Sequence, residues 1–175
     1  MRYKISFLLF ILMPFSLCAA SWPYSEKVLL KELDDAYAKV EERANFCSDL
    51  RSRKITKINS DWLLTLSEHQ RQIALFAVSN MALDRCMKQV EGDYNTALIN
   101  YTSKTGDKTK FDRWMILNSN YPKEIQADFN KLDQNELIKL SKQAELSIPF
   151  YPKVDKSIIL PNGDDNSPFI YKNND

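Results

Sequence analysis

Residues 67–104 carry an apolar pattern that only a long α-helix can bury along one side. Ser67 and Gln70 form the Ser-x-x-Gln pattern of a helix N-terminus. Apolar or aromatic side chains then recur at steps of three and four residues, with Asn80 as the one polar interruption: Ile73, Phe76, Leu83, Met87, Val90, Tyr94, Ala97 and Tyr101. A helix of this length is not stable by its own propensity and must pack this stripe against other helices.

Gly92 lies inside this pattern, and Thr105-Gly106-Asp107 provides turn residues at its end. The apolar stripe continues in phase on both sides of Gly92, which favours one continuous helix that ends near residue 105. In an alternative interpretation, Gly92 ends one helix and Asp93 caps the next.

Further helices are predicted on both sides of the long one. Residues 26–50 show one apolar face that includes Cys47, and Ser60 can cap a short helical turn. Three more helices are expected after Gly106: residues 108–117, a helix containing Ile125 and Phe129, and one opened by Asp133-x-x-Glu136. We therefore predict an all-α bundle of four to six helices over residues 21–146.

The N-terminus has the anatomy of a secretory signal peptide. Arg2 and Lys4 precede an apolar run over residues 5–17, and small residues at 18–20 suggest cleavage after Ala20. The apolar run is shorter than the roughly 20 residues that cross a bilayer. We expect residues 1–20 to be removed and the protein to be periplasmic or secreted, in a bacterium, with no stable membrane insertion. A lipid anchor at Cys18 and an uncleaved membrane anchor are the alternatives.

The cysteines predict a disulfide. Of the three cysteines in the chain, Cys18 is lost with the signal peptide, which leaves Cys47 and Cys86. In an oxidising compartment such a pair is usually bridged. Because Cys86 lies about 28 Å along the long helix from Ser67, residues 51–66 must run back along that helix, and Trp62, Leu63 and Leu66 should pack. Residues 51–60 are otherwise interpreted as a basic, solvated connector.

Composition argues against several functions. Loss of Arg2 and Lys4 changes the net charge from +1 to −1, which does not suit nucleic acid or an anionic membrane. Only three glycines are available for phosphate-binding loops. His69 is the only histidine, and we interpret it as an ordinary surface residue. We predict no catalytic residues, no metal site and no cofactor.

Residues 147–175 differ in composition from the helical part. Prolines at 149, 152, 161 and 168 prevent further helix, so an extended tail is predicted, in which residues 156–160 could pair with residues 169–171 as a hairpin. The tail carries the candidate partner-binding side chains Phe150, Tyr151, Phe169 and Tyr171. In the alternative, these anchors cover the protein's own bundle.

Residues 66–71 (Leu-Ser-Glu-His-Gln-Arg) resemble the Leu-Thr-x-x-Gln signature of the periplasmic Spy/CpxP family of helical chaperones. Residues 132–136 match the same signature less closely. A helix cap also accounts for these residues. We predict a non-catalytic exported protein that binds another protein as an adaptor, inhibitor or accessory factor of the cell envelope. A periplasmic chaperone that shields apolar client segments is the alternative that the resemblance implies, and a cell-wall-acting enzyme ranks below both.

Overall fold

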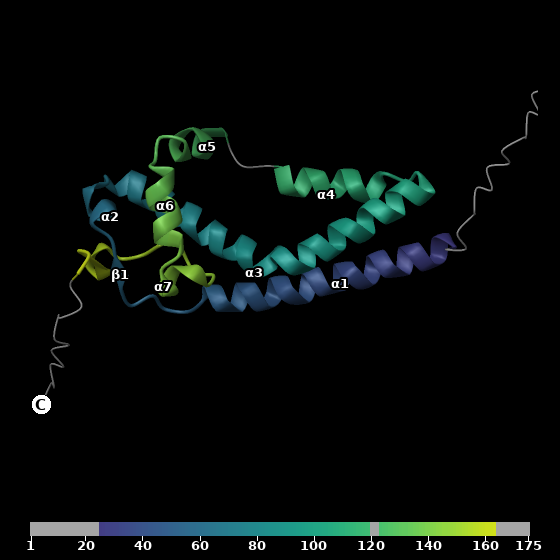
Figure 1. Ribbon diagram of the computed structural model, residues 1–175, viewed down its shortest axis with the longest axis horizontal. Coiled ribbons are helices and arrows are strands. Elements are labelled where there is room, and N and C mark those ends of the chain that lie inside the picture. Colours follow the sequence, from purple (N-terminus) through teal and green to yellow (C-terminus); the bar gives the residue numbers. More distant parts are fainter. Residues whose placement is uncertain (1–24, 120–122, 164–175) are drawn as a thin grey trace, which may run out of the picture.

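The computed structural model describes residues 25–119 and 123–163 of the chain. These residues form seven α-helices and two short strands: α1 (Glu26–Arg51), β1 (Ile58–Asn59), α2 (Asp61–Thr65), α3 (Glu68–Thr105), α4 (Thr109–Ser119), α5 (Lys123–Phe129), α6 (Gln134–Ser141), α7 (Ala144–Ser147) and β2 (Ile159–Leu160). The helical fold with one long central helix is confirmed (Figure 1). The described part has seven helices instead of the expected four to six, because the single helix expected after Asp133 is divided into α6 and α7.

Helix α3 begins and ends at the predicted signals. The backbone N–H of Gln70 donates to Ser67 Oγ, and the Ser67 N–H donates to Gln70 Oε1, which completes a capping box. Gly106 ends the helix in the left-handed conformation, with its N–H donating to the Thr102 carbonyl. Gly92 does not interrupt the helix. At 1.5 Å per residue α3 is about 57 Å long.

The C-terminal half of α3 pairs with α1 in an antiparallel stem. We call the buried residues of this pair the stem cluster: Leu29, Leu33, Val40 and Cys47 from α1, with Met87, Tyr94, Leu98 and Tyr101 from α3. The predicted Cys47–Cys86 disulfide joins the two helices, with 6.2 Å between the Cα atoms. Helix α4 folds back along the end of α3 and packs Phe111 and Trp114 against this cluster (Figure 1).

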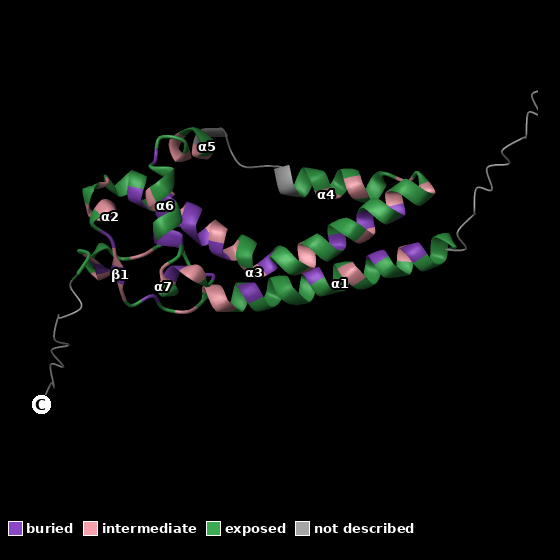
Figure 2. Ribbon diagram, viewed as in Figure 1, coloured by how far each residue is buried: buried purple, intermediate pink, exposed green. Residues whose placement is uncertain are grey.

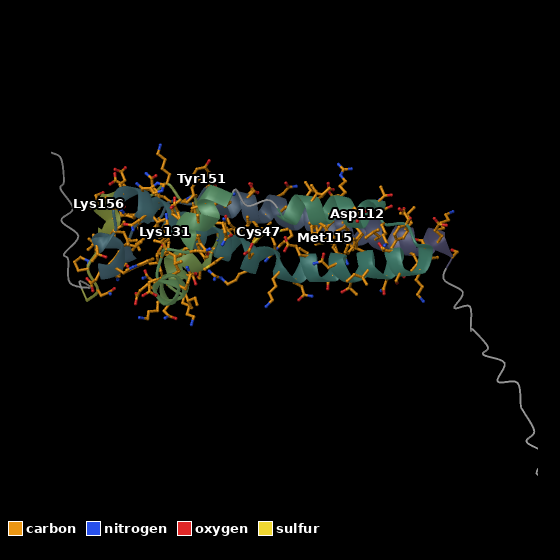
Figure 3. All side chains as sticks on the ribbon, turned by 90° about the horizontal axis from the view of Figure 1, so that it is seen from above. Cys47, Asp112, Met115, Lys131, Tyr151 and Lys156 are labelled. Atoms are coloured by element: carbon orange, nitrogen blue, oxygen red, sulfur yellow. A yellow bond between two sulfur atoms is a disulfide. The ribbon has the colours of Figure 1, made fainter. Side chains whose placement is uncertain are left out.

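The N-terminal half of α3 is surrounded by the rest of the chain. We call these buried residues the head cluster: Ile55, Ile58, Leu63, Ala74, Leu75, Ala77, Val78, Leu132, Leu137, Leu140, Leu146, Phe150 and Ile159. Among the described helices, α3 alone has buried residues in both clusters. Figure 2 shows buried positions along both halves of α3. In Figure 3, Cys47 lies between the head, marked by Lys131 and Lys156, and helix α4, marked by Asp112 and Met115.

The interpretation of residues 51–60 as a solvated connector is wrong. Ile58 is fully buried, Ile55 is nearly so, and Ile58–Asn59 form strand β1. Arg53 donates to the carbonyls of Ile148 (3.0 Å), Pro149 (3.1 Å) and Glu145. Carbonyls at the end of a helix lack intrahelical partners, and a guanidinium can satisfy several of them together. The expected packing of Trp62, Leu63 and Leu66 against the core is confirmed.

Residues 149–160 are part of the head, so packing does not stop at the predicted boundary after Leu146. Strand β2 pairs in parallel with β1, with Ile58 opposite Ile159. The side-chain amide of Gln143 accepts from the Asn59 N–H and donates to the Asn59 carbonyl. β2 thus pairs with residues far earlier in the chain, whereas the other strand of the expected hairpin, residues 169–171, lies outside the described residues. The predicted signal peptide, residues 1–20, also lies outside them. Within residues 25–119 and 123–163, none of the helices combines the length with the apolar character that a membrane span needs.

Candidate partner-binding groove

Helix α3 is apolar on more than one side where it passes through the head. The run from Ile73 to Val78 contains six consecutive apolar residues. The head cluster buries Ala74, Leu75 and Val78 from this run, whereas Ile73 and Phe76 stay half-buried at its edge. A helix that is apolar beyond one face needs a second covering surface. The structure covers this second face only in part.

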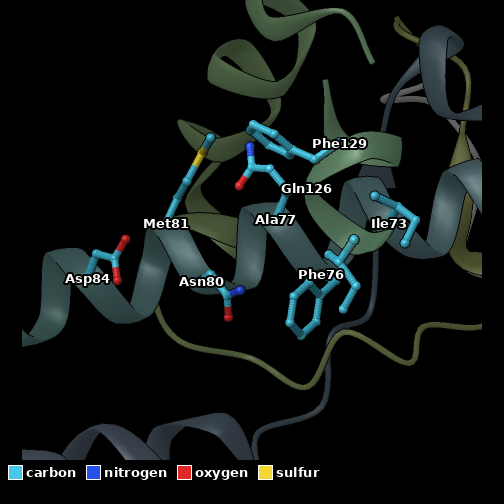
Figure 4. Close-up of a pocket in the computed structure, with 9 residues that line it drawn as sticks. Ile73, Phe76, Ala77, Asn80, Met81, Asp84, Gln126 and Phe129 are labelled. Carbon is cyan, nitrogen blue, oxygen red and sulfur yellow. The ribbon is translucent and has the colours of Figure 1, made fainter. Parts of the chain in front are cut away.

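Helix α5 lies across this second face, and an open pocket of about 250 Å³ lies between α3 and α5. The pocket is lined from α3 by Ile73, Phe76, Ala77, Asn80, Met81 and Asp84, and from α5 by Ile125, Gln126 and Phe129. Figure 4 shows Met81 extending from α3 toward Gln126 and Phe129. Most of the lining is therefore apolar, with two side-chain amides and one carboxylate.

A second hollow of about 870 Å³ continues toward the start of α3. It shares Ile73, Phe76 and Ile125 with the first pocket, and its other side is formed by residues 152–154 and Lys156. The two hollows together form what we call the α3 groove. From Glu68 to Asp84 the groove follows about 24 Å of helix. An apolar surface of this length on a continuous helix is suited to hold a segment of another molecule.

Charge is distributed unevenly along the α3 groove. Arg71, Lys153 and Lys156 line the end near the start of α3, together with Glu68. Asp84 lines the opposite end. Burial raises the pKa of Asp84 above its usual range, and this effect outweighs the opposing effect of the positive charge on Arg85. The groove therefore has a basic end and an acidic end.

His69 and Asp128 connect the start of α3 to α5. The His69 Nε2 atom lies 3.0 Å from Asp128 Oδ2, and Lys131 Nζ donates to Asp128 Oδ1 over 2.8 Å. The hydrogen bond from Lys131 has the largest effect on Asp128, followed by that from His69, and both hold the pKa of Asp128 below its usual range. The expected surface histidine is thus exposed but makes a contact between helices beside the groove.

Of the four predicted partner-binding residues, the structure describes two, Phe150 and Tyr151. The Phe150 side chain is fully buried in the head cluster, and its carbonyl accepts from Ser79 Oγ over 2.7 Å. Phe150 therefore covers the protein's own helical bundle, as in the alternative interpretation of the tail. Tyr151 is 65% exposed, and its ring lies 5.6 Å from the Arg51 guanidinium. Phe169 and Tyr171 lie outside the described residues.

Ile73 and Phe76 belong to the apolar stripe of α3 that the sequence predicts to be buried, and Met81 and Phe129 are not among the predicted site residues. The signal was present, because six consecutive apolar residues cannot all face one side of a helix. Within the described residues, no group of three or more His, Cys, Asp or Glu side chains could hold a metal ion. Comparison with protein-family models, curated proteins and solved structures found no match to this chain.

Proposed function

We propose that this protein acts by binding another protein through the α3 groove, as an adaptor, inhibitor or accessory factor of the cell envelope, and catalyses no reaction. The observation that carries this proposal is the group of apolar side chains along the groove, of which Ile73, Phe76, Met81 and Phe129 are only partly covered. Covering such side chains is favourable by about 25 cal/mol per Å² of apolar surface removed from water.

The groove is also supported as a binding site by its rigid framework. Its α3 side lies on a helix that the capping box fixes at Ser67 and that the head cluster holds from the other face. Residues 152–156 are held nearby, because Phe150 and Ile159 on either side of them are buried. A site that is preformed loses less conformational entropy on binding.

Affinity capture from the cell-envelope fraction tests the proposal. Wild-type protein and the variant Phe76→Asp are compared, with Phe46→Asp as a matched control because Phe46 is 49% exposed on α1 in the stem. We expect wild type and Phe46→Asp to retain the same stoichiometric partner and Phe76→Asp to lose it. If a folded Phe76→Asp protein, checked by circular dichroism, retains the partner, the groove is not the binding site.

Export is the second part of the proposal. It is supported by the signal-peptide pattern of residues 1–20 and by the Cys47–Cys86 disulfide, which is typical of oxidising compartments. Intact-mass measurement of the protein from envelope fractions should give a chain that starts at Ser21. A mature chain that retains residues 1–20 would contradict cleavage.

A chaperone-like function is the second candidate, and the surface of α4 favours it. Met115 and Leu117 are 49% and 69% exposed near the end of this helix. Exposed apolar side chains could shield apolar segments of several clients. This candidate predicts that the protein suppresses aggregation of unrelated unfolded proteins and that Met115→Ser/Leu117→Ser abolishes the suppression. Binding of a single stoichiometric partner without suppression of aggregation would favour the first candidate.

A further inference from the structure

We propose that the α3 groove selects a partner segment in which apolar residues are accompanied by acidic ones, with a carboxylate of the partner paired to Arg71. This inference rests on the proposed function and specifies the chemistry of the partner. In the bound state the apolar side chains would cover Ile73, Phe76 and Met81, and the acidic side chains would lie at the end of the groove formed by Lys153 and Lys156.

Arg71 is the residue that points to a carboxylate. Arg71 lines the groove, and the residue is only 8% exposed. Its Nη1 atom is buried without a hydrogen-bond partner. A buried donor without an acceptor is unfavourable, and the cost is larger for a charged group. A carboxylate is the preferred partner of a guanidinium, so an acidic side chain that enters the groove beside Arg71 is the group that suits this position best.

The surrounding charges favour the same ligand. Lys153 and Lys156 are exposed at this end of the groove, and neither pairs with a carboxylate within the described residues. Among the described residues that line this end of the groove, Glu68 is the one acidic residue, and its Oε1 lies 3.5 Å from Gln72 Nε2. The basic residues therefore outnumber the acidic one, which attracts an acidic partner and speeds its association.

The opposite end of the groove gives the ligand a direction. Asp84 lines this end, so an acidic side chain of the partner would meet a like charge there. The partner must therefore place its carboxylates near Arg71 and its apolar residues toward Met81. About 24 Å of α3 corresponds to roughly seven residues of extended chain or between four and five turns of helix. A 12-residue probe is long enough to sample this surface in an extended form.

Selection from a random 12-residue peptide library displayed on phage tests the inference. The library is selected on the wild-type protein and, in parallel, on the variant Lys153→Glu/Lys156→Glu, in which both altered side chains are exposed. We expect peptides enriched on wild type to combine apolar residues with an excess of Asp and Glu at one end. The charge-reversed variant should instead enrich peptides with Lys and Arg.

The most enriched peptide is then synthesised with a fluorescent label, and its Kd is measured by anisotropy. Arg71→Met keeps much of the side-chain volume but removes the charge, and we expect it to weaken binding about tenfold or more. Arg113→Met on the exposed surface of α4 is the matched control and should leave the Kd unchanged. The wild-type Kd should rise with salt concentration.

Three results would overturn the inference. The first is enrichment of apolar peptides without acidic residues; if Phe76→Asp abolished their binding, the proposed function would stand while this inference failed. The second is the same set of peptides on the charge-reversed variant. The third concerns the chain's own C-terminus: tighter peptide binding by the full-length variant Phe169→Asp/Tyr171→Asp would show that the tail, and not a partner, occupies the groove.

Discussion

Gly92 shows how one residue in α3 bears on the stability of a long helix. It is exposed, its backbone is not in the left-handed region, and a Cβ atom at this position would have no neighbour within 4 Å. Gly92 is therefore neither a helix end nor a close approach between helices. Nothing in its surroundings requires glycine, although glycine loses more conformational freedom on folding than any other residue.

We predict that Gly92→Ala stabilises the protein by about 0.5–1 kcal/mol, because alanine has the higher helix propensity. Urea denaturation of both proteins measures this difference. Gly106→Ala is the comparison: Gly106 has a φ of 76°, so this variant should be destabilised. A loss of stability in Gly92→Ala would show that the backbone there is not regular helix.

Asp107 gives a prediction about pH. It accepts a hydrogen bond from the Thr109 backbone N–H over 2.9 Å and another from the Tyr101 hydroxyl over 3.3 Å. The bond from Thr109 is the main reason that the pKa of Asp107 is lowered. A lowered pKa means that its stabilising contribution is complete above the unfolded pKa of about 3.9 and is lost as the pH falls through the lower folded pKa.

Thermal melts at pH 7 and pH 2 should therefore separate Asp107→Asn from wild type. We expect the variant to melt at a lower temperature at pH 7 and the two proteins to converge at pH 2. Asp112→Asn, on the exposed surface of α4, should melt like wild type at both pH values. An Asp107→Asn deficit that persists unchanged at pH 2 would contradict a charge-dependent role.

At the scale of elements, the disulfide fixes α1 against the middle of α3. Cys47 is fully buried in the stem cluster, and the bridge spans 39 positions of the chain. On the chain-entropy model, a loop of this length contributes about 4 kcal/mol. We predict that Cys47→Ala/Cys86→Ala loses roughly this much free energy of unfolding in urea.

The helices themselves should survive this change. Leu33, Leu98 and Tyr101 remain as apolar contacts between the two helices, so the far-ultraviolet circular dichroism spectrum of the double variant should still be helical. A large loss of helical signal at room temperature would mean that the disulfide, and not apolar packing, holds the stem together.

For the whole molecule, the position of residues 147–163 decides how the C-terminal segment behaves on deletion. Phe150 and Ile159 belong to the head cluster, and Arg53 binds carbonyls of Ile148 and Pro149. We predict that truncation after Leu146 lowers the melting temperature sharply. Phe150→Ala alone should cost about 3–5 kcal/mol, the usual range for a buried phenylalanine.

Tyr151→Ala is the matched control for this prediction. Its side chain is exposed, and its contact with Arg51 accounts for about 0.5–1 kcal/mol at such a site. Differential scanning calorimetry of the two variants compares a buried and an exposed aromatic at neighbouring positions. Equal melting temperatures would contradict the docking of Phe150 in the head.

Features that depend on nearby residues could be predicted from the amino-acid sequence. Ser67 with Gln70, Asp133 before α6 and Gly106 after α3 mark helix ends because each forms its hydrogen bonds within a few positions. The stem face of α3, from Met87 to Tyr101, followed from a regular period of three and four. Cys47 and Cys86 were identifiable as a pair because they were the only two left after the expected cleavage.

Which face of residues 73–78 is buried depends on long-range packing, because a run of consecutive apolar residues has no preferred side. Two contacts join segments about 100 positions apart: Ile58 pairs with Ile159, and Arg53 donates to the Pro149 carbonyl. No local sequence pattern encodes such contacts. The α3 groove exists because α5 and residues 152–156 pack on either side of Ile73 and Phe76 without covering them. Its basic end likewise depends on long-range packing, which places Lys153 and Lys156 beside Arg71.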